Sequence, residues 1–532
     1  MVPQHSAPHA ITPLLRGSRS PRAERPARVA LFVAWLIVAG WLAHEHVMWR
    51  DEVRALSLAL TGDSVVAMLR RIQGEGHPAL WYLLLRGAYA IAGVRQVLPG
   101  IAFAIGAAAA VLFAWRAPFR VPVIALVLFG AFFLYEYTVS ARNYGIAMLL
   151  LFAFAAAYPG WKARGVGLGL ILALLCNTNV PAVLLAGALS LFWCIELLCS
   201  EGLVWTARWR HFAINMGLAL VGVAACLAEV YPPYNDAAVS PMAGHLGLGT
   251  VLLAAVNVTT PFIALVPESW WGVPLILVLL AIGVLGGPFG LIRSPGGLVA
   301  GLAVAVAMPV FFQLVYPGSY RHQALYLAFL LTIYWLVTDG GGGCWSGGAV
   351  VRPAMASALQ RFGQAGFLTL LIAQVAIAAG LVAATASGAV ASRSAALGAL
   401  LHREALTRAV VIAQFDMLTE SLPYYAPNPI WQVRERRWGQ VAAFTKAAQR
   451  DVSMRELLAT AQTLHARTGR PVAILIATPL DPAAPAQSWP MGYVGSFSTT
   501  PADTRAFLSA TRPLARFAPA ATDESYTAYL LR

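Results

Sequence analysis

Charged side chains are scarce in this chain of 532 residues: they make up 11% of it, whereas hydrophobic residues make up 59%. Soluble domains carry about 25% charged residues, so the composition excludes an ordinary soluble protein. Several windows of roughly 20 residues carry no charge, which is the length that a helix needs to cross a bilayer. The sequence therefore predicts a mainly α-helical membrane protein.

Cysteine is also rare, and its placement excludes a disulfide scaffold. The five cysteines lie in or beside apolar segments, no CxxC pair occurs, and the region after residue 388 has none. We therefore expect packing residues and no disulfide framework. They are Cys176, Cys194, Cys199, Cys226 and Cys344.

Acidic residues are fewer than basic ones, which leaves a formal net charge of +14. In a soluble protein this excess would suggest nucleic acid. In a membrane protein, basic loops facing an anionic cytoplasmic leaflet explain it better. We expect contact with the lipid bilayer and no nucleic-acid partner.

The N-terminal segment 1–27 is rich in Pro, Arg and Ser and has no cleavage site before the next polar loop. It predicts a disordered basic tail that keeps the N-terminus in the cytoplasm. The first crossing is expected at 29–43, running from the inside to the outside.

Further apolar segments predict the remaining crossings. They lie near 97–114, 121–138, 143–159, 165–180, 182–198, 212–230, 271–290, 296–314, 322–338 and 364–388. If each crosses once, five basic loops fall on the side of the N-terminal tail, as the positive-inside rule requires. These loops contain Arg116 and Arg120, Lys162 and Arg164, Arg208 and Arg210, Arg293, and Arg352 and Arg361.

The apolar segment 79–93 breaks this alternation if it is counted as a crossing. We interpret it as a juxtamembrane or re-entrant helix on the outer side, so the bundle has about 11 crossings, with 12 as the alternative. The outer face would then hold the loop 44–96 and a long loop, 231–270, whose apolar part 250–266 lies along the membrane. The Gly-rich segment 338–348 predicts a linker, since it lacks the Lys-Ser/Thr of a P-loop.

After residue 388 the composition changes to that of a small α/β domain, 389–532, which the crossing count places in the periplasm. Four segments have the composition of strands, and 436–467 has helical spacing that ends at a Gly-Arg pair. The segments with strand composition are 408–414, 431–434, 471–477 and 526–532. The predicted domains are thus the tail 1–27, a membrane domain 28–388 and the periplasmic domain.

Two groups of polar residues follow the first crossing. Asp51 and Glu52 come directly after it, where they could act in a reaction or simply begin a helix, with Arg54 pairing with Asp51. Glu75 and His77 precede Pro78 and a second apolar segment. They could ligate a divalent ion, but two ligands are too few for a closed site, and a polar helix cap is an equal alternative.

Two basic groups occur at later outer corners. Arg142 and Tyr144 lie in the sequence SARNY between two apolar segments, and Arg321 and His322 lie at the outer end of 296–314. An arginine at the depth of Arg321 can bind a lipid phosphate through two hydrogen bonds. Snorkelling and interfacial anchoring are the alternatives.

In combination these motifs resemble the GT-C polytopic glycosyltransferases, in particular the protein O-mannosyltransferase, aminoarabinose transferase and RgtA/B/C/D-like group. The resemblance covers about residues 28–340. It is carried by WRDE (49–52), GHPALWY (76–82), SARNY (140–144) and the pair 321–322. The family's second Pro in the GHPPL-type element is Ala79 here.

The resemblance implies a GT-C-type bundle in the bacterial inner membrane and an inverting sugar transfer on its periplasmic face. The donor would be a polyprenyl-phosphate sugar, and the acceptor a cell-envelope glycan, lipid or protein. Asp51 would be the general base, and Glu52 would orient it or bind the acceptor. The donor phosphate would be bound by Arg142, Tyr144, Arg321 and His322.

The same resemblance implies a divalent ion (Mg, Mn or Zn) near the donor phosphate, with Glu75 and His77 as its ligands. Two other classes of protein remain open. A transporter or lipid flippase also buries charges along a pathway, but the sequence shows no paired halves. The other is a membrane scaffold or sensor, which would not explain the charged residues around Asp51.

Overall fold

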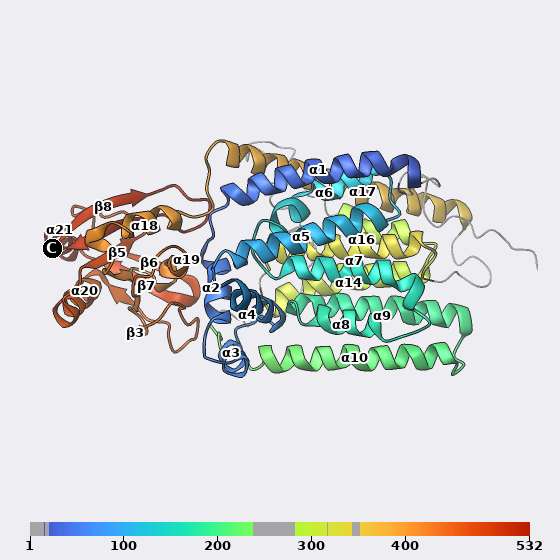
Figure 1. The fold of residues 1–532 in the computed structure, drawn as a ribbon, viewed down its shortest axis with the longest axis horizontal. Helices are drawn as coiled ribbons and strands as arrows, with labels where there is room; N and C mark the ends of the chain where they lie inside the picture. The colour runs from blue at the N-terminus through green and yellow to red at the C-terminus, as the bar shows by residue number, and fades with distance from the viewer. Residues whose placement is uncertain (1–14, 16–20, 238–281, 317, 343–351) are drawn as a thin grey trace, which may run out of the picture.

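Long apolar helices dominate the computed structural model, which describes residues 15, 21–237, 282–316, 318–342 and 352–532. Within this described part, seven helices are long and apolar enough to cross a membrane. They are α1 Pro21–Glu45, α5 Val97–Arg116, α7 Tyr144–Trp161, α9 Val180–Glu201, α10 Ala207–Val230, α14 Pro295–Leu314 and α17 Pro353–Ala386. They pack side by side into a bundle (Figure 1). The mainly α-helical, multi-pass membrane fold predicted from the sequence is confirmed.

Other predicted crossings are shorter or broken. The segment 121–138 forms α6, Val121–Leu128, and one π-helical turn, η1, Phe132–Glu136. The remaining short elements of the bundle are α8 Gly167–Cys176, η3 Gly287–Leu291, α15 Tyr320–Gln323 and α16 Leu325–Thr338. The segments 250–266 and most of 271–290 lie outside the described residues. The count of 11 or 12 crossings therefore stays a prediction.

The prediction that residues 1–27 form a disordered tail is wrong at its end, because α1 already begins at Pro21. Proline suits the first turn of a helix, where its missing N–H has no partner to lose. Arg28 then fixes this turn: its guanidinium pairs with Glu24 and donates to the carbonyl oxygens of Ala114, Ala117 and Phe119. The start of α1 is thus attached to the end of α5.

Two close helix contacts depend on glycine. A Cβ on Gly169 of α8 would lie 2.7 Å from the carbonyl oxygen of Asn215 in α10, and one on Gly222 of α10 would lie 2.4 Å from Cα of Ala173. The Asn215 side chain uses this approach, since its Oδ1 accepts a hydrogen bond from the Gly169 N–H at 2.7 Å. Small residues allow helices in a membrane to pack this closely.

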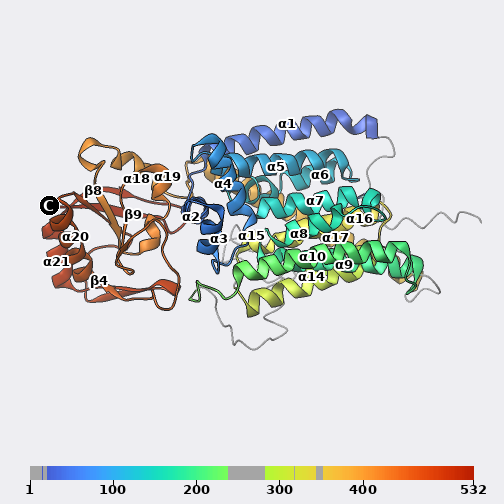
Figure 2. The ribbon, with the colours of Figure 1, turned by 60° about the horizontal axis from the view of Figure 1, so that its bottom comes forward.

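Three short helices cover one end of the bundle, next to the C-terminal domain (Figure 2). They are α2 Arg50–Ala59, α3 Val65–Ile72 and α4 Leu80–Ala92. We call this the α2 end. The helix α4 has 13 residues, or about 20 Å at 1.5 Å per residue, which is shorter than the hydrocarbon core of a bilayer. It occupies most of the segment 79–93, and whether it crosses stays a prediction.

The basic loops gather at the opposite end. The contacts of Arg28 place the starts of α1 and α6 together, and Lys162 pairs there with Glu196 of α9. Glu196 also accepts a hydrogen bond from the Gly342 N–H, and the Gly342 carbonyl accepts one from Gly296 at the start of α14. Basic loops on one face are what the positive-inside rule predicts.

The C-terminal domain begins after α17 ends at Ala386. Its main sheet has the order β1-β5-β9-β8, in which β1 and β5 are parallel and the other neighbours antiparallel. A second sheet has the order β4-β7-β6. The elements are α18 Ser394–Leu401, β1 Val410–Ala413, η5 Asp416–Thr419, α19 Leu422–Tyr425, β2 Trp431–Gln432, β3 Arg437–Trp438, β4 Val452–Ser453, α20 Met454–Thr468, β5 Val472–Ile476, β6 Gln487–Met491, β7 Gly495–Thr499, α21 Pro501–Ala510, β8 Thr511–Phe517 and β9 Tyr526–Leu531. The small α/β domain is confirmed.

The predicted helix 436–467 is wrong in its first half. Only α20 is helical, and Ser453 caps its start by accepting from the Glu456 N–H. The preceding residues 439–446 form neither helix nor strand, because side chains of other residues accept hydrogen bonds from their backbone N–H groups. Ala442, Ala443 and Phe444 donate to Glu420, Glu435 and Asn235.

Candidate active site

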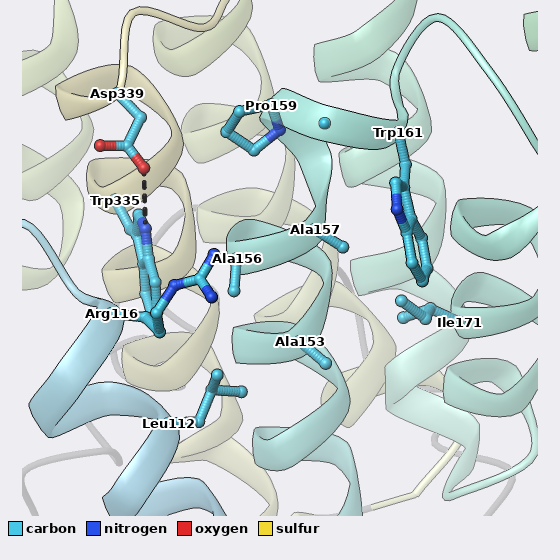
Figure 3. Close-up of a pocket in the computed structure, with 11 residues that line it drawn as sticks. Leu112, Arg116, Ala153, Ala156, Ala157, Pro159, Trp161, Ile171, Trp335 and Asp339 are labelled. Atoms are coloured by element: carbon cyan, nitrogen blue, oxygen red, sulfur yellow. Dashed lines mark hydrogen bonds between the residues drawn. The ribbon is translucent and has the colours of Figure 1, made fainter.

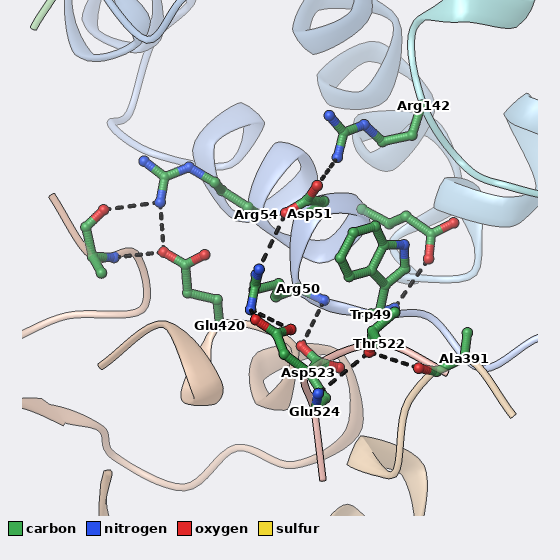
Figure 4. Close-up of polar contacts among 12 residues, drawn as sticks. Trp49, Arg50, Asp51, Arg54, Arg142, Ala391, Glu420, Thr522, Asp523 and Glu524 are labelled. Carbon is green, nitrogen blue, oxygen red and sulfur yellow. Dashed lines mark hydrogen bonds and ion pairs between the residues drawn. The ribbon is translucent and has the colours of Figure 1, made fainter. Parts of the chain in front are cut away.

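The helix α2 begins at Arg50, shortly after α1 ends at Glu45, with Trp49 as its N-cap residue. Glu52 lies three residues later, and its carboxylate accepts the Trp49 N–H at 3.0 Å, which is half of a capping box. This fixes the first turn of α2. Asp51 in that turn points toward the membrane domain (Figure 4).

Asp51 is surrounded by arginines from distant parts of the chain. Its Oδ2 lies 2.8 Å from Arg142 Nη1 and 3.6 Å from Arg321 Nη1, and its Oδ1 lies 3.6 Å from Arg50 Nε. Burial acts to raise the pKa of this carboxyl, but the guanidinium groups outweigh it and lower the pKa to about 2. The Asp51 side chain is still 33% exposed. It is thus an ionised carboxylate that a bound molecule can reach.

Arg142 is held by the corner between η1 and α7. The neighbouring Asn143 donates from Nδ2 to the Thr178 carbonyl at 2.6 Å, which ties the corner to the start of α9. The Arg142 guanidinium also lies 5.9 Å from the centre of the Tyr144 ring. Of the two residues predicted in this corner, Arg142 therefore pairs with Asp51 directly, and Tyr144 lies beside the Arg142 guanidinium.

Glu52 does not face the site, so its position fits the alternative that it orients Asp51 better than acceptor binding, which stays a prediction. It is fully buried. Its carboxylate accepts from the Ala141 N–H at 2.6 Å as well as from Trp49, and it lies 3.0 Å from Nε2 of His46. With both oxygens engaged inside the protein, Glu52 links α2 to the corner that carries Arg142.

Arg321 enters from α15, the short helix before α16. Its backbone carbonyl accepts from the Tyr137 hydroxyl at 2.7 Å, and its guanidinium lies 4.9 Å from the Trp49 ring centre. Within the described residues, its Nη1 is buried without a hydrogen-bond partner. The donor is thus available to an anionic ligand.

His322 lies behind Arg321. Its Nδ1 is 2.9 Å from the Ser319 hydroxyl, and its ring stands edge-on to that of Tyr144 at 5.2 Å. Because the ring is buried among aromatic side chains, we expect it to shape the site, with Tyr144, more than to carry charge there.

Glu75 and His77 form no preformed metal site. The Glu75 Oε2 lies 2.8 Å from Arg54 Nη2 and accepts from Asn235 Nδ2 at 3.0 Å. Among the described residues, no three His, Cys, Asp or Glu side chains gather as a metal would require. This donor set does not fit a closed cation site.

His77 has a different character. Burial, together with the nearby Arg142, lowers its pKa to about 3, so its imidazole is neutral at physiological pH. Arg54, which the sequence suggested as a partner of Asp51, instead pairs with Glu75 and with Glu420.

Several residues of the site were missed from the sequence. Trp49 contributes its ring to Arg321, and His46 contributes its imidazole to Glu52. Both lie within five residues of Asp51, and that proximity was the available signal. Asp523 and Glu524, which contact Arg50, gave no signal because they lie at the far end of the chain.

A groove of about 520 Å³ lies at the opposite end of the bundle (Figure 3). Its walls are mostly apolar, and its polar groups include Arg116 and Asp339, whose carboxylate accepts from Trp335 Nε1 at 3.0 Å. It is distant from Asp51 and holds none of the predicted site residues.

Two solved structures resemble most of the chain. They are crystal structures of ArnT from Cupriavidus metallidurans. One is bound to undecaprenyl phosphate and is 13% identical; the other is in the apo state and is 14% identical. Each match has a TM-score of 0.47 and covers 94% of this chain and 97% of ArnT. No protein-family model and no curated protein matches the chain. Similarity at this level assigns no reaction, so the function rests on the residues themselves.

Proposed function

We propose that this protein is a GT-C-type glycosyltransferase. It transfers a sugar, with inversion, from a polyprenyl-phosphate donor to a cell-envelope glycan, lipid or protein. The site lies at the α2 end of the bundle, which we place on the periplasmic side of the bacterial inner membrane. The N-terminus would then be cytoplasmic and the C-terminal domain periplasmic.

One observation carries this proposal: a single reachable carboxylate shares two guanidinium groups. Within the described residues, Asp51 is the one acid that lies within 4 Å of Arg142 or Arg321. The third arginine near Asp51, Arg50, is also paired with Asp523. Arg142 and Arg321 against the one carboxylate leave an excess positive charge, which favours an anionic ligand such as a phosphate. The order of these motifs along the chain matches the order that the GT-C resemblance predicts.

The arginines would bind the leaving phosphate. As the bond between the sugar and the phosphate breaks, negative charge grows on the phosphate oxygens. Preorganised guanidinium groups stabilise that charge most strongly in the transition state. The Nη1 of Arg321, which has no hydrogen-bond partner among the described residues, is placed for this role.

Asp51 would accept the proton of the attacking acceptor hydroxyl. A carboxyl whose pKa is about 2 is a weak base, because the arginines stabilise its charged form. A donor phosphate that binds the same arginines would share their charge and raise the pKa of Asp51 toward its ordinary value. Donor binding would thereby activate the base.

The transporter alternative receives no support from the described helices. Charged contacts occur at the two ends of the bundle, and the groove at the opposite end is walled mainly by apolar side chains. A transport pathway instead carries its polar groups to the middle of the membrane.

The test is Asp51→Asn in the full-length protein. We expect loss of sugar transfer by at least about 100-fold, as removal of a general base causes, measured by mass spectrometry of cell-envelope glycans. Binding of undecaprenyl phosphate to the purified protein should be kept or tightened, since a competing negative charge is removed. That lipid is the probe because a similar structure was solved with it.

Asp339→Asn is the matched control: the same chemical change, in the groove at the opposite end. It should keep transfer near the wild-type rate. Full transfer by Asp51→Asn would refute the assignment of Asp51 as the base. Failure of the wild-type protein to bind undecaprenyl phosphate would refute the donor class.

A further inference from the structure

The helix that carries Asp51 has a second charged face, which points away from the membrane domain. Arg50 and Arg54 lie one residue before and three residues after Asp51, and both reach the C-terminal domain (Figure 4). Asp51 itself reaches Arg142 on the other side. The base is therefore held between two parts of the protein.

Arg54 makes the more deeply buried of these links. Its Nη1 lies 2.5 Å from Glu420 Oε1 and donates to the Ala442 carbonyl at 2.8 Å, while the Phe444 ring centre lies 4.6 Å from its guanidinium. The Glu420 side chain is 1% exposed and also accepts the Ala442 N–H at 2.7 Å. Charge-assisted hydrogen bonds of this kind are short and directional.

Arg50 makes the second link, at the start of α2. Its Nη1 lies 2.5 Å from Asp523, and its backbone N–H donates to Glu524 at 2.9 Å. The Tyr425 hydroxyl donates to the Met48 carbonyl at 3.0 Å, just before the helix begins.

The same guanidinium joins a third segment. Arg54 Nη2 binds Glu75, whose carboxylate accepts from Asn235. Asn235 in turn accepts the N–H of Phe444 in the C-terminal domain. Arg54 is thus the point where α2, the segment before α4 and the C-terminal domain meet.

We infer that Glu420 is a positioning residue for the base: it acts through Arg54 to hold Asp51 at the correct distance from Arg142. This inference rests on the proposed function of Asp51. A displacement of about 1 Å at a reacting group can cost about 100-fold in rate. A domain that fixes the helix of the base therefore controls the rate without touching the substrates.

The link depends on pH. Burial raises the pKa of Glu420 to about 7, although Arg54 and the Ala442 N–H act against it. The other charged groups that act on Glu420 are Arg50 and Asp51, both from α2. Above pH 7 the ionised carboxylate binds Arg54, and below pH 7 it gains a proton and the link weakens. Transfer should therefore fall as the pH drops from 8 to 6.

The experiment compares Glu420→Gln with Glu456→Gln in the full-length protein. Glu456 is the matched control because it pairs with Arg450 inside the C-terminal domain and does not contact α2. Undecaprenyl phosphate binding is measured on purified protein, and the rate of glycan transfer in membranes is measured between pH 6 and pH 8.

We expect Glu420→Gln to lose transfer at least tenfold at pH 8, with undecaprenyl phosphate affinity within twofold of wild type. Its transfer should also fall less toward pH 6 than that of the wild type, since it has no carboxyl at 420 to protonate. Burial raises the pKa of Glu524, at the Arg50 link, to about 7 as well, so part of the fall remains. Glu420→Asp should recover part of the rate together with the pH dependence. Glu456→Gln should match the wild type in transfer rate, in undecaprenyl phosphate affinity and in pH dependence.

Wild-type transfer and an unchanged pH profile in Glu420→Gln would overturn the inference, and so would equal losses in Glu420→Gln and Glu456→Gln. If Glu420→Gln does not elute as a monodisperse protein, Glu420→Asp alone decides, and a flat pH profile in it refutes the role. Failure of the proposed function looks different, because wild-type protein would then neither bind the lipid nor transfer sugar.

Discussion

Two ion clusters, at opposite ends of the bundle, differ in whether all of their charges and hydrogen-bond donors have partners. At the end opposite α2, the Glu196 carboxylate binds one cation, Lys162, and accepts hydrogen bonds from the Tyr158 hydroxyl and the Gly342 N–H. Acid and base are balanced there. At the α2 end, Asp51 faces Arg142 and Arg321, and one Arg321 nitrogen lacks a hydrogen-bond partner among the described residues.

The difference separates a structural role from a functional one. In a balanced cluster every charge has a partner inside the protein, so the cluster joins helices and loops to one another. An unbalanced cluster with an exposed carboxylate still has charged groups that can bind a ligand. Buried charge by itself indicates neither role, whereas excess charge of one sign, open to a ligand, indicates a site.

Among the variants that test this difference between the two clusters, the largest effect on lipid binding is expected from substitution of Arg142. Removing its guanidinium in Arg142→Ala should weaken undecaprenyl phosphate binding about 10- to 100-fold, since hydrogen bonds to charged groups contribute about 1.5–3 kcal/mol. Arg142→Lys should recover only part of the affinity, because a single ammonium cannot bind two oxygens in parallel. Direct binding measurements on purified protein check both variants.

Lys162 provides the control for that experiment. Lys162→Ala also removes one cation from an ion cluster of the bundle, yet it should leave the lipid affinity within twofold of wild type. Equal losses in the two variants would mean that general charge, and not the site at the α2 end, attracts the lipid.

A smaller effect, on stability alone, is expected from Glu196→Gln. Neutralising this acid leaves Lys162 without its partner and should lower the free energy of unfolding by about 1–3 kcal/mol. Thermal unfolding in detergent should show a lower midpoint, while the rate of sugar transfer in membranes stays within twofold of wild type. A loss of transfer with no change in the midpoint would contradict the structural role.

The smallest effect is expected from metal removal. Because Arg54 and Asn235 already engage Glu75, we expect chelation with EDTA to change transfer less than twofold. The resemblance to GT-C transferases implies the opposite. A loss on chelation that Mg, Mn or Zn restores would establish a cation requirement and would contradict this expectation.

Much of the fold follows from local patterns. Apolar length predicted the long helices, and each of the four segments predicted as strands contains one: β1, β2, β5 and β9. The helix predicted over 436–467 failed in its first half, because its backbone N–H groups donate there to the side chains of Glu420, Glu435 and Asn235 in place of helix carbonyls.

The candidate site was only partly predictable. Asp51, Arg142 and Arg321 stood out because a charged residue beside a membrane segment is energetically costly and often marks a functional site. Glu52 stood out equally, yet the structure buries it against Ala141 and His46. Sequence position cannot separate the two neighbours, since adjacent residues of a helix point about 100° apart.

The sequence by itself determined that this is a multi-pass membrane protein, with acids and arginines at the ends of its apolar segments and a small α/β domain after them. Only the tertiary structure decided which charges meet. Arg54 and Glu420 are separated by 366 residues, and Arg50 and Asp523 by 473. Hydrophobic periodicity acts over a few residues and determines which segments form helices, whereas the pairing of charges depends on how those helices and the C-terminal domain pack together.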